Sequence, residues 1–494
     1  MTFRALKPID GTPYGVEIPE HTKADVDSRI KKAAAVSRAI ATQSPKERAL
    51  LLRTIAAEIE AVRTSLIESA CAETALPEAR IGGEITRTTV QFELFARLVE
   101  TGKHLGVVID KADANYSPAP RPDIRKMNVP LGVVAIFAAS NFPLAFSVAG
   151  GDAASAIAAG NAIIAKAHPS HPNTCATIEL AIKSALKKCG LSEDLYSIVQ
   201  GVNPEITHWL ALHDDVKAVG FTGSEVVGKI LVDLAATRKE PIPVFAEMGS
   251  LNPVFITQNA IADRSEALAK GIIDSALMGS GQFCTKPGLV FMPKDENFLS
   301  TMKTHLATLS VAPLLSKSIA ERYSSAIARL SAAGQLEVAS GIANDSGFGV
   351  TPTLFITDWA TASSNHELLE EHFGPTTVVI TCDESQYIEI AASLQGQLTA
   401  TIQGTDADEP AELLSVLKEK AGRVIWNGFP TGVAVTSAMN HGGPWPSSSS
   451  HTTSVGTDAI YRFMRPVAYQ GFAQNVLPEP LQDSNSWAVP QDIN

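Results

Sequence analysis

Two patterns of apolar positions alternate along the chain. Residues 23–72 place apolar side chains at helical spacing, and one helix in this range has a complete start signal. Ser44 is a good N-cap, Pro45 occupies the first helical position and Glu47 completes a capping box. A second helix is expected at about 77–105. Further along, short apolar runs alternate with helical patterns, which is typical of an open parallel sheet covered by helices.

The most apolar stretch, residues 131–167, carries only Asp152 and Lys166 as charges. Asn, Pro and Gly residues interrupt it, so no run reaches the roughly 20 apolar residues that a membrane span needs. Short apolar runs joined by a helix are instead typical of a parallel sheet buried on both faces. We therefore expect a strand at 133–138, a helix at about 144–158 and a strand at 162–166.

The length of 494 residues requires more than one domain, because a single core stops growing at roughly 250–300 residues. Strand and helix patterns continue to about residue 247, and a second α/β unit begins near 248. Residues 111–130 are polar and proline-rich, which favours an extended arm. The tail from residue 457 is aromatic and proline-rich. Neither segment has an obvious partner within the chain.

Charge and cysteine content exclude several classes of protein. A net charge of −12 argues against nucleic-acid binding, which needs a basic surface. The five cysteines are odd in number and contain no Cys-x-x-Cys pair, which indicates neither a disulfide framework nor a zinc site. The N-terminus has no apolar core of signal-peptide length. We expect a cytoplasmic protein without a metal and without a membrane partner.

Cys284 lies in the glycine-rich stretch "GSGQFCTKPG". A thiol attacks only as the thiolate, and small neighbours would let a substrate and backbone N–H groups approach the sulfur. A buried structural cysteine is the alternative. Glu247 directly follows the apolar strand "PVFA", at the end where α/β sheets bind ligands, although a salt bridge or helix N-cap would also explain it. Asn141 could donate to an oxyanion or simply form a turn before a proline.

The stretch "FTGSEVVG" predicts a strand, a turn and a helix, with Gly223 and Ser224 at the helix start. Free N–H groups at a helix N-terminus are a natural phosphate site. The spacing is not the Gly-x-Gly-x-x-Gly dinucleotide fingerprint, so alone it is a weak signal. Lys166 ends another strand and could reach a ribose or phosphate, or could simply be solvated.

Together these segments resemble the aldehyde dehydrogenase superfamily over nearly the whole chain. The matching segments, in order, are "ASNFPLAF", "AGNAIIAKAHPSHP", "FTGSEVVGKI", "FAEMGSLNPVFI", "GSGQFCTKPG", "EEHFGPTTVV" and "GGPWPSSSSHTTSVG". The resemblance implies an α/β fold with a Rossmann-type parallel-sheet cofactor domain, a second α/β catalytic domain and a small β oligomerisation arm. These correspond to residues 1–110 with 131–246, residues 247–456, and residues 111–130 with 457–494.

The resemblance also implies roles for individual residues. Cys284 would be the nucleophile, Glu247 the general base, and Asn141 with the Cys284 backbone N–H the oxyanion hole. Lys166 would hold the adenosine ribose, and Glu371 the nicotinamide ribose. The residues expected to contact the cofactor are Lys166, His168, Ser170, Phe221, Gly223, Ser224, Glu371 and Phe373.

Within the superfamily, the C-terminal motifs and "AKAHPSHP" are similar to the α-ketoglutarate semialdehyde (2,5-dioxopentanoate) dehydrogenase branch, which is near the NADP-dependent fatty aldehyde enzymes. Glu93 and His451 or a serine stand where that branch commonly has basic residues, which leaves a neutral aliphatic or aromatic aldehyde as an alternative substrate. Pro169 replaces the glutamate that often binds the 2′-hydroxyl in NAD-preferring relatives. NADP is therefore favoured, with NAD use open.

Three other functions remain as alternatives at this point: CoA-acylating aldehyde oxidation, a cysteine hydrolase, and a non-catalytic binding protein on the same fold. Glu247 as a water-activating base argues against acyl transfer to CoA. The nucleotide-site residues would have no role in a hydrolase, and a non-catalytic protein would have no physical need for Cys284, Glu247 and Asn141 together. The expected partners are a small-molecule aldehyde and further copies of the chain, in a homodimer or homotetramer.

Overall fold

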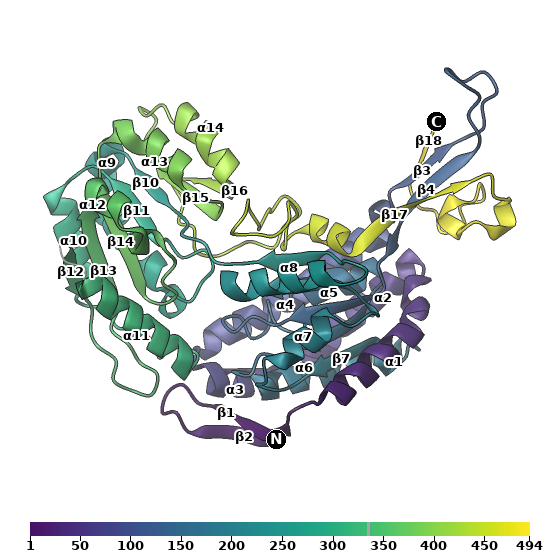
Figure 1. The fold of residues 1–494 in the computed structure, drawn as a ribbon, viewed down its shortest axis with the longest axis horizontal. Helices are drawn as coiled ribbons and strands as arrows, with labels where there is room; N and C mark the ends of the chain where they lie inside the picture. Colours follow the sequence, from purple (N-terminus) through teal and green to yellow (C-terminus); the bar gives the residue numbers. More distant parts are fainter. Residues whose placement is uncertain (333–335) are drawn as a thin grey trace.

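The computed structural model describes residues 1–332 and 336–494 (Figure 1). In this part of the chain, the N-terminal half is built on a parallel sheet in the order β7-β6-β5-β8-β9. Its strands are buried on both faces, as the apolar runs predict. They are β5 (Val133–Phe137), β6 (Ala162–Lys166), β7 (Tyr196–Val199), β8 (Val216–Thr222) and β9 (Val244–Glu247).

Helices cover both faces of this sheet and share one apolar core with it. The expected capping box is confirmed: Ser44 Oγ accepts the backbone N–H of Glu47, and Ser44 N–H donates to the Glu47 carboxylate. The helices are α1 (Lys23–Ala41), α2 (Pro45–Ala61), α3 (Arg63–Thr74), α4 (Glu78–Glu100), α5 (Gly151–Ala159), α6 (Pro172–Lys188), α7 (Glu205–Ala211) and α8 (Glu225–Thr237).

The expected helix at 144–158 was placed too early, because α5 begins only at Gly151. The preceding residues form turns. The buried Glu84 carboxylate accepts the backbone N–H groups of Leu144 and Ala145, each at 3.0 Å. These hydrogen bonds attach the segment to α4, and the segment does not form a helix. An apolar sequence signal cannot distinguish such a buried turn from a helix.

The second α/β unit contains a sheet in the order β12-β13-β14-β11-β10-β15-β16, parallel except for β12. Its strands are β10 (Val254–Ile256), β11 (Leu289–Met292), β12 (Glu337–Ser340), β13 (Thr353–Asp358), β14 (Thr376–Thr381), β15 (Gln397–Gln403) and β16 (Ala421–Trp426). Its helices are α9 (Gln258–Leu277), α10 (Glu296–Leu306), α11 (Lys317–Ala332), α12 (Trp359–Ser364), α13 (Tyr387–Ser393) and α14 (Ala411–Lys420).

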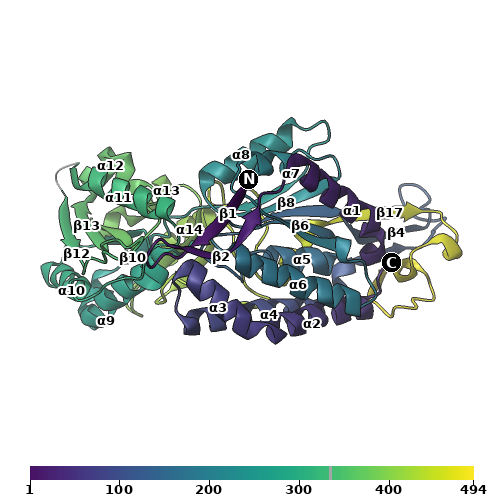
Figure 2. The same cartoon turned by 90° about the horizontal axis from the view of Figure 1, so that it is seen from below.

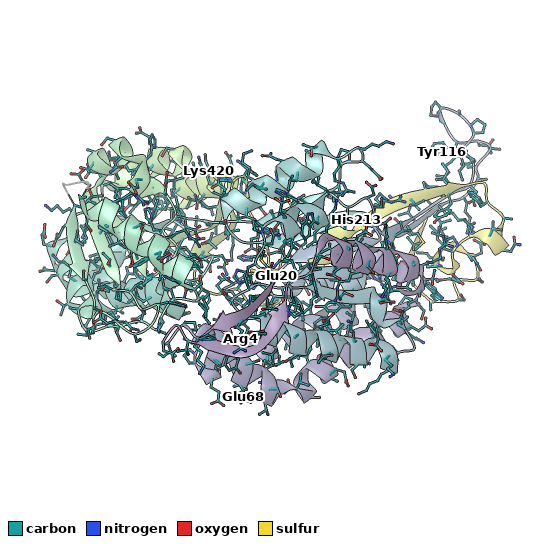
Figure 3. All side chains as sticks on the ribbon, turned by 60° about the horizontal axis from the view of Figure 1, so that its bottom comes forward. Arg4, Glu20, Glu68, Tyr116, His213 and Lys420 are labelled. Carbon is teal, nitrogen blue, oxygen red and sulfur yellow. The ribbon has the colours of Figure 1, made fainter. Side chains whose placement is uncertain are left out.

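The polar arm and the C-terminal tail do have partners within the chain, contrary to the sequence-based expectation. β4 (Ile124–Pro130) pairs antiparallel with both β3 (Val107–Asp110) and β17 (Met464–Gln470), and β18 (Gln491–Ile493) adds to β3. This sheet projects from the body in Figure 1, and Figure 3 shows Tyr116 at the tip of its loop. The pairing joins segments more than 300 residues apart, so local sequence could not reveal it.

The part of the chain built on the first sheet and the second α/β unit form two lobes. A hairpin of β1 (Thr2–Leu6) and β2 (Pro13–Pro19) lies between them in Figure 2. Its turn contacts the second lobe, where Phe348 N–H donates to the Pro8 carbonyl at 2.9 Å. Among the described residues, none of the helices combines the length and apolarity needed to cross a membrane.

Candidate active site

Cys284 lies between the two lobes, in the loop that precedes β11. The side chain of Asn252 fixes this loop, because its amide donates to the carbonyl oxygens of Cys284 at 2.8 Å and Lys286 at 2.9 Å. Asn252 itself has a positive φ of 47° and is fully buried. The Cys284 thiol therefore lies on a turn whose backbone is held by hydrogen bonds, and the small neighbouring residues allow close packing around the sulfur.

Glu247 ends β9 and directs a buried carboxylate toward this loop. The hydroxyl of Ser454 donates to Oε2 of Glu247, while His441 Nε2 lies 2.8 Å from Oε1. The same His441 nitrogen lies 3.5 Å from Sγ of Cys284. The reactive atoms of Glu247, Cys284 and His441 all lie within 4.8 Å of one another. One imidazole nitrogen thus lies near both the thiol and the carboxylate.

Electrostatics favour the protonated thiol in this arrangement. Burial and the negative charge of Glu247 raise the pKa of Cys284 well above its usual value, and Arg87 opposes them only in part. Burial alone would also raise the pKa of Glu247, but the neighbouring imidazole of His441 and the Ser454 hydroxyl reverse that effect, so its pKa is lowered. The resting site therefore combines a thiol with an ionised carboxylate that can receive a proton.

The serine run at residues 447–450, which has the composition of a low-complexity tract, supports the strand that carries Glu247. Ser449 N–H donates to the Ala246 carbonyl at 3.0 Å, and its hydroxyl accepts the Ala246 N–H at 2.8 Å. Met248 N–H in turn donates to the Ser447 carbonyl at 2.9 Å. The serine run thus pairs with β9 in the manner of a short additional strand.

Asn141 is brought to the cysteine loop from the other lobe. Its Nδ2 donates to the Gln282 carbonyl at 2.8 Å, two residues before Cys284. Phe142 and Phe283 pack edge to face beside it, with ring centroids 5.0 Å apart. One N–H of an amide group is used in this bond, and the second remains as a donor for an oxygen formed at Cys284.

A cavity of about 430 Å³ opens beside Cys284. One wall is α4, from which Arg80, Glu84 and Arg87 face the cavity. Arg80 stacks 4.4 Å from the Phe142 ring centroid, and Arg87 Nη1 donates to the Val433 carbonyl. Within the described residues, Nε and Nη2 of Arg87 and Nε of Arg80 are buried without a hydrogen-bond partner. The full lining is Ala79, Arg80, Gly83, Glu84, Arg87, Phe142, Phe146, Met278, Phe283, Cys284, Thr285, Gly432 and Val433.

The residues expected to bind a dinucleotide meet at the carboxyl edge of the first sheet. In register, Phe137 pairs with both Lys166 and Phe221, and Thr222 pairs with Glu247. Parallel sheets bind ligands at this edge. The expected cofactor residues on β6 and β8 therefore lie on the same edge as Glu247.

Lys166 is held at this edge by the carbonyls of Ala167 and Gly201, at 2.7 and 2.8 Å. Burial lowers its pKa to about 8. His168 stacks on His171 with centroids 5.5 Å apart, and its Nδ1 accepts the Ser170 backbone N–H. Burial lowers the pKa of His168 well below its usual value, so it can offer a hydrogen bond but no charge.

The turn from β8 to α8 is tightly packed. A Cβ at Gly223 would lie 2.5 Å from the Phe221 ring, so only glycine fits there. Gly223 N–H donates to the Glu247 carbonyl at 3.0 Å, which links this turn to the strand that carries Glu247. In the described structure the Ser224 side chain makes no capping bond, which leaves the first-turn N–H groups of α8 for a phosphate. These features fit a dinucleotide.

Glu371 and Phe373 come from the second lobe. The Glu371 carboxylate packs against Gly249, where an added Cβ would lie 2.1 Å from Oε2. Phe373 packs on the apolar cluster around Tyr323. Glu371 thus lies beside Gly249, which is two residues after the end of β9, although Glu371 is far from that strand in the sequence.

Glu93 is not a cavity residue, which removes one reason to doubt an acidic substrate. It points to Arg53, at 3.3 Å, while the cavity wall of the same helix carries Arg80 and Arg87. Glu93 lies on a different face of α4 from Arg80 and Arg87. The spacing of residues 80, 84 and 87 places them on one helical face, and this polar stripe was the available signal.

Sequence reasoning also missed His441 and Ser454. His441 stands in "MNHGGP", a glycine-flanked setting similar to that of the cysteine, but the chain offers no periodic pattern there. Its position beside Cys284 depends on a loop that returns from the second lobe. His451, which stands where the similar branch commonly has a basic residue, is exposed and does not line the cavity.

Comparison with known proteins identifies the class. Residues 1–467 match the model of the aldehyde dehydrogenase family, and the chain belongs to that family. It is therefore an NAD(P)-dependent aldehyde dehydrogenase, as the motifs predict, rather than a cysteine hydrolase or a non-catalytic binding protein.

The chain is similar to two bacterial enzymes along almost its entire length. It is 42% identical to alpha-ketoglutaric semialdehyde dehydrogenase 2 of Azospirillum brasilense, over 99% of this chain and 95% of that protein. It is 39% identical to an alpha-ketoglutaric semialdehyde dehydrogenase of Acinetobacter baylyi, over 100% and 95%. The fold matches the NADP complex of GapN from Methanocaldococcus jannaschii, with a TM-score of 0.81 at 20% identity, covering 94% of this chain and 98% of that one.

Proposed function

We propose that this enzyme oxidises 2,5-dioxopentanoate (α-ketoglutarate semialdehyde) to 2-oxoglutarate. The observation that carries the substrate is the placement of Arg80 and Arg87 in the cavity that contains Cys284. A guanidinium group binds a carboxylate through two parallel hydrogen bonds, and the unpartnered buried nitrogens of Arg87 offer two such donors. The names of the two bacterial relatives described above support the same substrate.

A neutral aliphatic or aromatic aldehyde fits this cavity less well. The phenyl rings of Phe142, Phe146 and Phe283 would accept an apolar chain, but the buried N–H groups of Arg87 would then stay unpaired. An unpaired buried donor costs about 1–3 kcal/mol, and more when it is charged. A carboxylate at the far end of the substrate removes this cost.

In the proposed reaction Cys284 is the nucleophile. His441, whose Nε2 lies 3.5 Å from Sγ, accepts the thiol proton, which leaves the Glu247 carboxylate ionised for the later hydrolysis. The sulfur adds to the aldehyde carbon to form a tetrahedral thiohemiacetal. The Asn141 amide and the Cys284 backbone N–H stabilise its oxyanion. The nicotinamide cofactor, when bound, accepts the hydride. The acyl group then remains bound to Cys284 as a thioester.

Hydrolysis of the thioester requires an activated water. The Glu247 carboxylate, with its lowered pKa, is ionised and buried beside the sulfur, so we assign it as the base. The His441 and Ser454 contacts orient this carboxylate. Water rather than CoA is the expected acyl acceptor, because a base this close to the thiol serves hydrolysis.

We also propose that NADP is the favoured cofactor. Lys166, His168 and Ser170 surround the expected adenosine end, and Pro169 places no acid there to repel a 2′-phosphate. Phe221, Gly223, Ser224, Glu371 and Phe373 would hold the pyrophosphate and nicotinamide side. In this proposal residues 1–110 and 131–246 form the cofactor domain and residues 247–456 the catalytic domain.

The remaining parts, residues 111–130 and 457–494, are proposed as an oligomerisation arm and tail of a homodimer or homotetramer. Exposed Tyr116, Phe472 and Val476 on this arm support a subunit contact, which light scattering would test against a monomer. The five cysteines are all free, which is consistent with a cytoplasmic enzyme.

Initial rates test the proposed substrate. The kcat/KM for 2,5-dioxopentanoate should exceed that for hexanal and benzaldehyde by roughly tenfold to hundredfold, the value of a charge-assisted contact. The same panel with NADP and NAD tests the cofactor preference. Equal kcat/KM values for the oxo acid and hexanal would favour the neutral-aldehyde alternative.

A further inference from the structure

Lys286, two residues after Cys284, has a buried amino group that the proposed chemistry does not use. Only 3% of the residue is exposed. Its Nζ donates to three backbone carbonyls, of His372 at 2.7 Å, Thr376 at 2.8 Å and Gly374 at 3.1 Å. An ammonium group has three N–H donors, and all three are used here.

The three acceptors lie in one short segment, residues 372–376, which directly follows Glu371. The carbonyl oxygens of this segment converge on one point and would repel one another without a cation between them. Lys286 and Glu371 also act on each other electrostatically. The ammonium therefore fixes the backbone to which the Glu371 side chain is attached.

The other end of Lys286 is fixed to the nucleophile. Asn252 donates to the carbonyls of both Cys284 and Lys286, so one side chain holds the backbone of both residues. The two loops also touch directly, because a Cβ at Gly281 would lie 2.1 Å from the Gly374 oxygen. One side chain thus connects the cysteine loop with the Glu371 segment.

We propose that Lys286 is a positioning residue that holds Glu371 in place for the nicotinamide half of the dinucleotide and couples that place to Cys284. This inference rests on the proposed cofactor role of Glu371. It assigns Lys286 no contact with the substrate or the cofactor. Its effect passes through the backbone of residues 372–376.

Methionine is the informative replacement, because it has a similar length and apolar volume but neither charge nor donor. In Lys286→Met the three carbonyls lose their shared donor and the segment relaxes. The affinity for NADPH should fall by about tenfold, because a displaced Glu371 keeps only part of its charge-assisted contact with the cofactor. The affinity for 2′,5′-ADP, which represents only the adenosine half, should stay unchanged because Lys166 lies in the other lobe.

Fluorescence titration of NADPH, with 2′,5′-ADP as a competitor, measures both affinities without an aldehyde. Lys294→Met, an exposed lysine of the same lobe paired with Glu296, is the matched control and should bind both ligands as the wild type does. If Lys286→Met does not fold, Lys286→Gln, which keeps two N–H donors, should show the same selective loss in smaller measure.

Each result decides the proposal. Selective weakening of NADPH supports it. Unchanged affinity for both ligands, or equal weakening of both, would overturn it, because the latter indicates a general structural role. A wild-type protein that binds neither NADPH nor NADH would instead contradict the proposed function, and this outcome is visible before any variant is compared.

Discussion

The imidazole of His441 lies 3.5 Å from the sulfur of Cys284, although the two residues are 157 positions apart in the sequence. The same nitrogen lies 2.8 Å from Glu247. This relationship gives the thiol a neighbour that can take its proton, in a site where burial and the Glu247 charge hold the thiol protonated.

Replacement of His441 should therefore slow the formation of the thiohemiacetal. We expect His441→Gln to lower the pre-steady-state rate of NADPH formation by roughly 10²-fold, the lower range for loss of a general base. Stopped-flow absorbance at saturating substrate measures this rate. His451→Gln, an exposed residue of the same loop, is the control. An unaltered burst rate in His441→Gln would show that the proton leaves directly to Glu247.

Glu247→Gln should separate the two halves of the reaction. Hydride transfer needs the thiol, His441 as the acceptor of its proton, the oxyanion donors and the cofactor, which all remain, whereas thioester hydrolysis needs a base that glutamine cannot provide. We expect a burst of NADPH close to one per active site, followed by slow turnover. Mass spectrometry should detect the trapped acyl-enzyme. Steady turnover at the wild-type rate with no acyl-enzyme would assign water activation to another group.

The Glu247→Gln variant should also change how the alkylation rate of the Cys284 thiol depends on pH. Because burial and the Glu247 charge raise the pKa of Cys284, alkylation of the wild type by iodoacetamide should accelerate with rising pH through and beyond pH 9. Removing the carboxylate charge lowers that pKa, so Glu247→Gln should be alkylated faster than the wild type at pH 8. Slower alkylation of the variant would mean that Glu247 is needed to deprotonate the thiol.

Asn141→Ala removes an expected oxyanion donor. Loss of one such donor typically costs roughly 10²–10³-fold in kcat. The Gln282 carbonyl would also lose its partner, so thermal unfolding should be recorded beside the kinetics. A variant with wild-type kcat and only a raised KM would indicate that Asn141 acts in the turn and not on the oxyanion.

Arg87→Met tests the substrate cavity. The KM for 2,5-dioxopentanoate should rise by roughly tenfold to hundredfold, because a charge-assisted contact is lost, while hexanal should be oxidised as well as before or better. Arg97→Met, an exposed position on the same helix, is the control. Equal effects on both aldehydes would place Arg87 outside substrate recognition.

Much of the fold and part of the site follow from local sequence. The Ser44–Glu47 capping box, the buried strands and the position of Cys284 in its glycine-rich loop depend on neighbours within a few residues, so residue type and spacing are sufficient to predict them. The family motifs add Glu247 and Asn141, since each is recognised by the residues on either side of it.

The tertiary structure alone decided what surrounds those residues. His441 and Ser454 reach Glu247 because the 447–450 segment pairs beside β9, and Arg87 reaches the cavity because α4 packs over the 141–146 turn. Lys286 looks like an ordinary loop lysine until its amino group is placed among three carbonyls of a distant segment. Such contacts arise from the docking of two lobes, which joins residues a hundred or more positions apart, and no local periodicity in the chain encodes that distance.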